Sequence, residues 1–332
     1  MKRILFVTSQ YRAGERIYPT IPHLAKEYKL DLLKVYQMLP SHAWVGDLDM
    51  RNLFLREYSK YFNNIYEGYV DPRTYDLILT DDNRLSEKTK LYNLYSNKNA
   101  NTKMISCVHG NGGFKKVNQS HNLVFDKCLT FGRYDTIHKS SIPTGIPAND
   151  KLFQYKDLDK KHILIIVNFL GNRECPYKVK FDSKLFNDEK IKTLQKHFNL
   201  PIVIKLKSRA DEGGFSHNLK YIKNTIDSDL DYTVIVDVED DNKLIAESVC
   251  VISAPSTLSL KSIQLGIPTI LIKDSGELGS FENYDGFFSI NDDFLGYIYS
   301  YERKIDFIEN TIEGGLTFNS TQVFLDTIKK HI

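Results

Sequence analysis

The chain has 332 residues, of which 42% are hydrophobic and 26% are charged, a composition typical of a globular protein of about two domains. Lysine and arginine number 44 against 42 aspartate and glutamate residues, so the net charge of +2 gives no bulk attraction for nucleic acid, and we expect no nucleic-acid partner. The four cysteines are widely spaced, which excludes a Cys-x-x-Cys zinc site and a disulfide framework. No apolar run is long enough for a signal-peptide core or a membrane span, and we therefore expect a cytoplasmic protein.

The first half of the chain alternates short apolar runs with helical patterns. Strands are predicted at 3–8, 31–36, 75–80, 103–108 and 127–131, and helices at 20–28, 56–69 and 85–95. Strands that alternate with helices indicate a parallel sheet covered on both faces.

After a polar stretch near residues 150–160 the alternation starts again. Strands are predicted at 163–169, 201–207, 232–238, 250–254 and 269–274, and helices at 188–198, 217–226, 241–248, 257–266 and 320–331. Two series of this kind predict an α/β protein of two Rossmann-like, doubly wound parallel-sheet domains, residues 1–150 and 151–332. Ligands of such sheets bind at the carboxyl ends of the strands, so we expect the site in the cleft between the domains.

The turn at residues 253–257 reads Ser-Ala-Pro-Ser-Thr and leads from a strand directly into a helix. Its hydroxyl groups, on Ser253, Ser256 and Thr257, and the free N–H groups of the helix N-terminus suit a phosphate. The alternative is an ordinary helix cap, since Ser, Thr and Pro all favour the first turn.

Three cations alternate where the strand at 201–207 ends: Lys205, Lys207 and Arg209. Alternation directs them to one face, where they would repel one another unless they faced an anion. The alternative interpretation is that the three cations are solvated residues at the point where the chain leaves the sheet.

In the first half, His109 follows a predicted strand and begins a glycine-rich loop that contains Gly110 and Asn111, with Lys115 nearby. A histidine at a strand end is a candidate general base, and a structural histidine is the alternative.

The turn after the first strand carries Arg12 and Arg16, which can bind an anion or remain solvated. This turn is no Gly-x-Gly-x-x-Gly, which disfavours a dehydrogenase.

Three segments together resemble the GT-B superfamily, and within it the CDP-glycerol glycerophosphotransferases that build teichoic acids and capsules. They are 108–115 (Val-His-Gly followed by Lys115), 144–152 (Thr-Gly-Ile-Pro-Ala-Asn-Asp-Lys-Leu) and 253–268. The resemblance implies an acceptor-side first domain and a nucleotide-donor second domain. Two positions depart from the pattern: 205–209 replaces a Lys-x-His-Pro turn, and Lys261 stands where that family has an acidic residue.

A weaker similarity links residues 9–21 and 266–286 to the non-hydrolysing UDP-N-acetylglucosamine 2-epimerases. Against it, the loop at 109–113 reads His-Gly-Asn-Gly-Gly where those enzymes carry His-x-Glu-Ala-Gly. The acid and base needed to deprotonate a sugar carbon are then missing.

The sequence therefore predicts a GT-B transferase that moves a sugar or polyol-phosphate group from a nucleotide-activated donor to a glycan acceptor. His109 is the expected catalytic base; the expected donor-phosphate residues are Lys205, Lys207, Arg209, Ser253, Ser256 and Thr257; Arg12, Arg16, Gly110, Asn111 and Lys115 are expected on the acceptor side or in the cleft. We expect no metal and no cofactor, with Asp81-Asp82 interpreted as a helix-start cap. The oligomeric state, peripheral membrane association, an epimerase-like activity and a catalytically silent binding protein stay open.

Overall fold

The computed structural model describes residues 1–8, 14–34, 45–81, 88–108, 124–134, 140–167, 188–206, 229–236, 240–272, 283–289 and 291–332, and the single residues 185, 219, 222, 224, 226 and 281. They form two compact units, Met1–Asp150 with Ile308–Ile332, and Lys151–Phe307. The sequence analysis assigns residues 151–332 to the second domain, whereas Ile308–Ile332 group with the first unit in the structure.

The first unit is built on a seven-stranded sheet in the order β3-β2-β1-β4-β5-β6-β7. Each strand pairs in parallel with its neighbours. The strand order reverses between β1 and β4, which in such sheets marks the edge where ligands bind. The strands are β1 (Arg3–Thr8), β2 (Lys29–Lys34), β3 (Asn64–Tyr66), β4 (Leu77–Thr80), β5 (Lys103–Cys107), β6 (Lys127–Thr130) and β7 (Ser141–Pro143).

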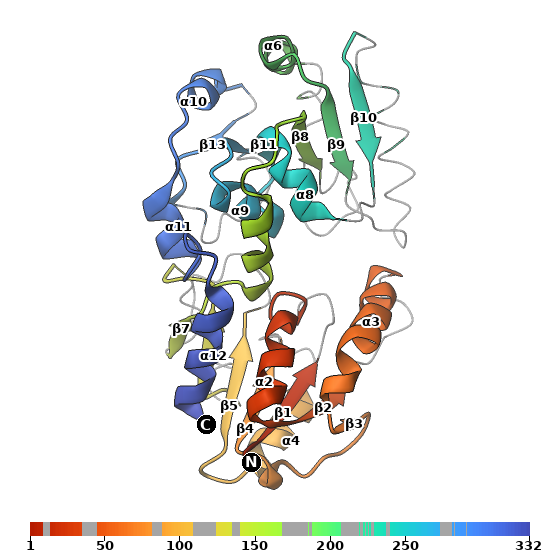
Figure 1. Ribbon diagram of the computed structural model, residues 1–332, viewed down its shortest axis with the longest axis vertical. Helices are drawn as coiled ribbons and strands as arrows, with labels where there is room; N and C mark the ends of the chain where they lie inside the picture. Colours follow the sequence, from red (N-terminus) through yellow and green to blue (C-terminus); the bar gives the residue numbers. More distant parts are fainter. Residues whose placement is uncertain are drawn as a thin grey trace. The chain divides into compact units, whose positions relative to one another are not determined.

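Helices cover both faces of this sheet (Figure 1). One face packs against α2 (Ile21–Glu27), α3 (Val45–Tyr58) and α12 (Ser320–His331), in a core that includes Phe6 and Phe324. The other face packs against α4 (Lys88–Asn97). The strands are apolar on both sides because both faces are buried.

The second unit has a six-stranded parallel sheet in the order β10-β9-β8-β11-β12-β13. Its helices are α6 (Glu189–Phe198), α8 (Asp241–Ala246), α9 (Thr257–Gln264) and α10 (Leu295–Tyr299), and α11 (Ile305–Thr311) spans the boundary between the units. The strands are β8 (His162–Val167), β9 (Ile202–Leu206), β10 (Tyr232–Ile235), β11 (Ser248–Ser253), β12 (Thr269–Ile272) and β13 (Phe287–Phe288).

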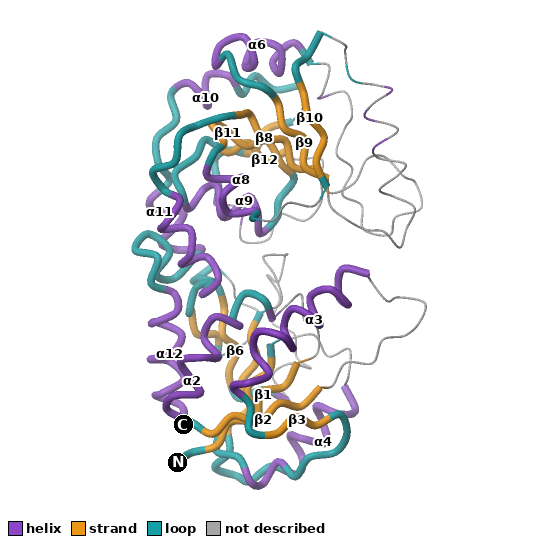
Figure 2. Tube along the Cα trace, turned by 45° about the vertical axis from the view of Figure 1, so that its right-hand side comes forward, coloured by secondary structure: helices purple, strands orange, loops and turns teal. Residues whose placement is uncertain are grey.

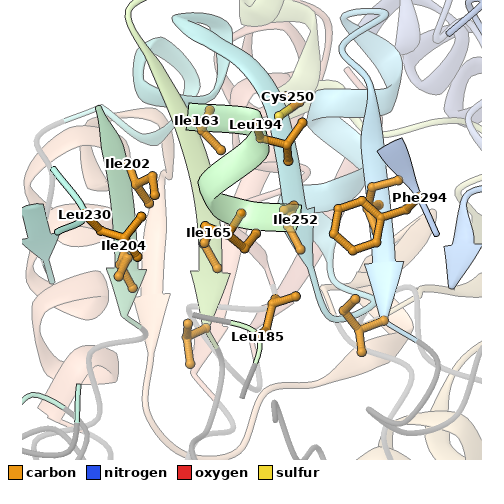
Figure 3. Packing of buried hydrophobic residues seen from close by; sticks show 14 of the residues in the cluster. Ile163, Ile165, Leu185, Leu194, Ile202, Ile204, Leu230, Cys250, Ile252 and Phe294 are labelled. Carbon is orange, nitrogen blue, oxygen red and sulfur yellow. The ribbon is translucent and has the colours of Figure 1, made fainter. Parts of the chain in front are cut away.

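Alternate residues of the second sheet face two separate cores. Ile163 and Ile165 pack with Leu194 of α6 and Phe294 on one face (Figure 3), and Leu194 is fully buried there. Leu164 and Ile166, which alternate with them along β8, pack on the other face with Ile245 of α8 and Leu258 of α9. Because successive side chains of a strand point to opposite faces of the sheet, every second residue of these strands faces α8 and α9.

Two doubly wound parallel sheets were predicted from the sequence, and the structure confirms that prediction. The predicted helix at 56–69 is wrong. There α3 ends at Tyr58, a 3-10 turn covers Ser59–Tyr61, and β3 follows. Asn63 and Asn64 donate side-chain hydrogen bonds to Leu30 O and to Asp31 on β2, so pairing with β2 overrides the helical pattern.

The helix predicted at 320–331 forms, but its cap comes from far away in the sequence. Asp150 accepts hydrogen bonds from the backbone N–H groups of Ser320 (2.9 Å) and Thr321 (2.7 Å). Gly145 has a φ of +77°, and a Cβ on it would meet Glu313 O at 2.1 Å and Ser320 Oγ at 2.2 Å. The segment 144–152 that supported the GT-B resemblance thus anchors the C-terminal helix.

Candidate functional site

The candidate phosphate site lies at the carboxyl edge of the second sheet. Lys205 on β9 pairs with Ile166 on β8, and Ile166 pairs with Ser253 on β11. Residues in register on parallel strands point to the same face, so Lys205 and Ser253 lie on the face that α8 and α9 cover. The fold therefore brings two of the predicted residues to one edge, separated by a single strand.

Lys205 is only 8% exposed and has a carboxylate partner. Its Nζ lies 3.3 Å from Oδ1 of Asp241, the first residue of α8. The sequence showed only the three alternating cations, because the acidic partner is distant in the chain. A phosphate near Lys205 would have to share this ammonium group with Asp241.

Ser253 is completely buried, and its Oγ donates a 2.6 Å hydrogen bond to Ala254 O within the turn. Its hydroxyl is thus already used by the protein. Within this turn, Ser256 and Thr257 are therefore the residues whose hydroxyl groups can contact a ligand.

Ser256 is the N-cap of α9 and forms a reciprocal capping box with Ser259. Ser256 Oγ accepts from Ser259 N (3.2 Å), and Ser259 Oγ accepts from Ser256 N (2.9 Å). The first N–H groups of a helix have no intrahelical partner, and the capping box leaves those of Thr257 and Leu258 without one in the described part of the chain. Such groups, with the positive end of the helix dipole, favour an anion.

Asp240 is the N-cap of the neighbouring helix α8, and its carboxylate accepts hydrogen bonds from Asn242 N (2.8 Å) and Lys243 N (3.3 Å). Tyr155 donates a 2.5 Å hydrogen bond to the same carboxylate. Burial would raise the pKa of Asp240, but the hydrogen bonds from Tyr155 and the two backbone groups, with the positive charge of Lys261, lower it below its usual value. Asp240 is therefore ionised at neutral pH.

Lys261 of α9 donates a 2.7 Å hydrogen bond to Asn242 Oδ1 of α8. This contact ties the two helices together and places an ammonium group near Asp240. The described charges at this edge are therefore balanced, with Lys205 against Asp241 and Lys261 against Asp240. Attraction for a phosphate there rests on the helix N-terminus.

The corresponding edge of the first unit contains Arg16, whose guanidinium lies over the ring of Phe131, 5.7 Å from its centroid. Phe131 directly follows β6, so the cation lies at the carboxyl edge of this sheet. Arg16 O also accepts a 2.9 Å hydrogen bond from Ala148 N.

A buried carboxylate at this edge was not recognised as such in the sequence. Asp81 follows β4 and is 1% exposed; its Oδ2 accepts from Thr8 Oγ1 (2.6 Å) and from the Tyr18 hydroxyl (3.2 Å). These two hydroxyl groups come from β1 and from the 3-10 turn before α2, while Asp82 and the residues that a helix-start cap at Asp81-Asp82 would serve lie outside the described residues. The feature of the sequence that could have indicated this buried position is that Asp81 directly follows a central strand.

Several predicted site residues lie outside the described residues: Arg12, His109, Gly110, Asn111, Lys115, Lys207 and Arg209. Val108, the residue before His109, is described: it lies buried at the carboxyl end of β5 and donates from its N–H to Leu129 O (2.9 Å). The roles of the seven remain predictions.

Within the described ranges, no three His, Cys, Asp or Glu side chains gather as a metal site would require. In the same part of the chain, no helix is both long and apolar enough to cross a bilayer.

The two parallel α/β sheets have the GT-B fold. The sequence itself matches no family profile and no curated protein.

Solved structures share this fold across nearly the whole chain. UDP-GlcNAc 2-epimerase from Neisseria meningitidis, bound to UDP-GlcNAc, is 13% identical with a TM-score of 0.59, covering 99% of this chain and all (100%) of that one. A glycosyltransferase from Rickettsia africae is 12% identical with a TM-score of 0.62, covering 99% and 98%. The wall teichoic acid polymerase TagF is 16% identical with a TM-score of 0.54, covering 99% and 88%. At these identities the similarity establishes the fold.

Proposed function

We propose that the protein is a metal-independent transferase that moves a sugar or polyol-phosphate group from a nucleotide-activated donor to a cell-surface glycan acceptor of the capsule, teichoic acid or lipopolysaccharide type. The observation that carries the proposal is the N-terminus of α9 at the carboxyl edge of the second sheet. There the N–H groups of Thr257 and Leu258 and the side chains of Ser256 and Thr257 are suited to the donor phosphate.

In the proposed reaction, His109 accepts the proton of the acceptor hydroxyl, and the resulting oxygen nucleophile attacks the transferred group. The bond between that group and the nucleotide phosphate breaks, and its electron pair goes to the phosphate oxygen. The α9 N-terminus, Lys205, Lys207 and Arg209 stabilise the charge that develops there. Arg12, Arg16, Gly110, Asn111 and Lys115 would line the acceptor side.

A second candidate is an epimerase-like activity on UDP-N-acetylglucosamine. It is favoured by several solved structures with this fold that are UDP-GlcNAc 2-epimerases. The loop at 109–113 lacks their His-x-Glu-Ala-Gly pattern, which is why we place the transferase first.

One experiment separates the candidates. The purified full chain is incubated with UDP-N-acetylglucosamine and with CDP-, UDP-, GDP- and CMP-activated donors, with glycan acceptors present. Phosphorus NMR follows nucleotide release, and proton NMR follows inversion at C2 of the sugar. Release of nucleotide supports the transferase, and inversion without release supports the epimerase. Binding without either reaction would refute both and indicate a silent binding protein.

A further inference from the structure

Basic side chains gather at the opposite, amino edge of the first sheet. Lys127 at the start of β6 pairs with Ile105 of β5, and Lys103 lies two residues before Ile105, so both lysines point to one face. That face is covered by α12, because Ile105 and Ile328 belong to one buried core.

The last turn of α12 reaches the same edge. Lys2, before β1, donates a hydrogen bond from its Nζ to Ile332 O, and the two ends of the chain lie close together in Figures 1 and 2. Lys330 and His331 are therefore presented beside the starts of the strands. We call Lys103, Lys127, Lys330 and His331 the amino-edge cluster.

The three lysines of the amino-edge cluster form no ion pair with any carboxylate of the described ranges. The acidic groups on the neighbouring elements have other partners: Glu27 lies 3.4 Å from Lys329, and Asp126 accepts from Met104 N and lies 3.7 Å from Lys98. On α12 itself, Asp326, four residues before Lys330, accepts a 2.9 Å hydrogen bond from Gln322 Nε2, and the terminal carboxyl group of Ile332 accepts from Lys2 Nζ. Like charges held together in this way repel one another, and a bound anion would relieve that repulsion.

The lysines act together on the imidazole. The pKa of His331 is lowered by partial burial and then by the positive charges of Lys127, Lys103 and Lys330. A cation near a helix C-terminus is ordinary, since it offsets the helix dipole, and this accounts for Lys330. It does not account for Lys103 and Lys127, which come from two strands.

We propose that Lys103, Lys127, Lys330 and His331 form an anion site that binds a phosphate group, as a monoester or a diester. Three ammonium groups supply charge, and the imidazole supplies a hydrogen-bond donor. The site is separate from the nucleotide site proposed at α9 and does not depend on it.

The test is an NMR titration of His331 in the full-length protein, with the signal assigned by His331→Gln. The titration is done in inorganic phosphate and in chloride at equal ionic strength. We expect phosphate to raise the pKa of His331 saturably, by about half a pH unit or more, because an anion favours the imidazolium. In the double variant Lys103→Gln/Lys127→Gln this dependence on phosphate disappears.

The matched control is Lys26→Gln/Lys29→Gln, which removes two exposed lysines of the same unit and keeps the phosphate effect. Equal pKa values in phosphate and chloride, or a phosphate effect that survives in Lys103→Gln/Lys127→Gln, would overturn the proposal. Melting temperatures in chloride establish that each variant is folded.

Vesicles identify the source of the phosphate. Phosphatidylglycerol vesicles that sediment with the wild type, but not with Lys103→Gln/Lys127→Gln, would show that lipid headgroups occupy the site. A phosphate effect without vesicle binding would support a soluble phosphate ligand. Phosphatidylcholine vesicles, which carry no net charge, serve as the blank.

Discussion

The carboxyl edge of the second sheet and the amino edge of the first differ in how they would attract phosphate. At the carboxyl edge Lys205 is paired with Asp241, Asp240 is held near Lys261, and the attraction comes from the α9 N-terminus. At the amino edge three lysines have no carboxylate partner among the described residues. One site is organised by fixed dipoles and the other by net charge.

This difference has a physical consequence. The N–H groups of a helix end and hydroxyl groups act through hydrogen bonds of about 3 Å, which depend on exact placement. Such a site therefore selects its ligand by geometry, and its affinity changes little with salt. Net charge acts over about 10 Å at 0.1 M salt, so such a site is less selective and weakens as salt is added. The five predictions below test the candidate site and this contrast.

The largest effect is expected from His109→Ala. Loss of a general base typically lowers turnover by about 10²-fold or more, with little change in nucleotide affinity. Turnover is measured with whichever donor is found to react, and His23→Gln, which changes an exposed histidine on α2, is the control. Wild-type turnover in His109→Ala would leave His109 a structural residue.

Ser256→Ala should weaken nucleotide binding by about 1 to 3 kcal/mol, the scale of a hydrogen bond to a charged group. Calorimetry measures the affinity, which should respond little to salt. The matched control is Asp188→Ala, which removes the N-cap of α6. Both variants should lose about 0.5 to 2 kcal/mol of unfolding free energy as caps, and only Ser256→Ala should lose affinity. Equal affinity in the two variants would reduce Ser256 to a cap.

Asp241→Asn should strengthen nucleotide binding. Without the carboxylate, the ammonium of Lys205 is released to the phosphate, and we expect about a threefold gain at low salt, in the range of a partly exposed ion pair. The gain should vanish in Asp241→Asn/Lys205→Gln. An affinity that Asp241→Asn leaves unchanged would mean that Lys205 takes no part in binding.

The smallest effect concerns two histidines whose pKa values are lowered for different reasons. Burial is the main cause for His162, whose Nε2 lies 3.0 Å from Leu244 O, whereas the lysines add to burial at His331. Raising the salt from about 0.05 to 0.5 M should therefore raise the pKa of His331 by a few tenths of a pH unit and leave His162 almost unchanged. Histidine NMR titrations measure both, and equal responses would contradict a charge-based amino-edge cluster.

His162 also makes stability depend on pH. Its pKa is lower in the folded state, so the unfolded chain binds a proton more readily once the pH falls below about 6.5. The unfolding free energy should then decrease from about pH 7 towards pH 5, and less steeply in His162→Gln. Chemical denaturation at several pH values measures this, and equal slopes in the two proteins would contradict it.

The sequence predicted most of the fold because buried parallel strands are apolar on both faces and stand out as runs. The strand Arg3–Thr8 and the helix Ser320–His331 form with the predicted bounds. The short strand Asn64–Tyr66 was missed because it is defined by bonds to β2 rather than by its own pattern.

The candidate site was predictable where a local pattern defines it, as with the Ser256 cap of α9. It was not predictable where partners meet only after folding. Asp241 beside Lys205, Asp150 at the start of α12 and the two hydroxyl groups on Asp81 are contacts between residues far apart in the chain. The lysines of the amino-edge cluster come from three elements and form no motif at all.

Because α12 packs on the first unit and is capped by Asp150, the order in which the ribosome makes the chain affects how the protein folds. Phe324 and Ile328 complete the core of the first unit, although they belong to the last helix of the chain. Residues 1–150 therefore emerge with an uncovered apolar face, while the continuous segment Lys151–Phe307 holds all the residues of its own unit. The second unit can finish folding first, and the half of the protein that is made earliest is completed last.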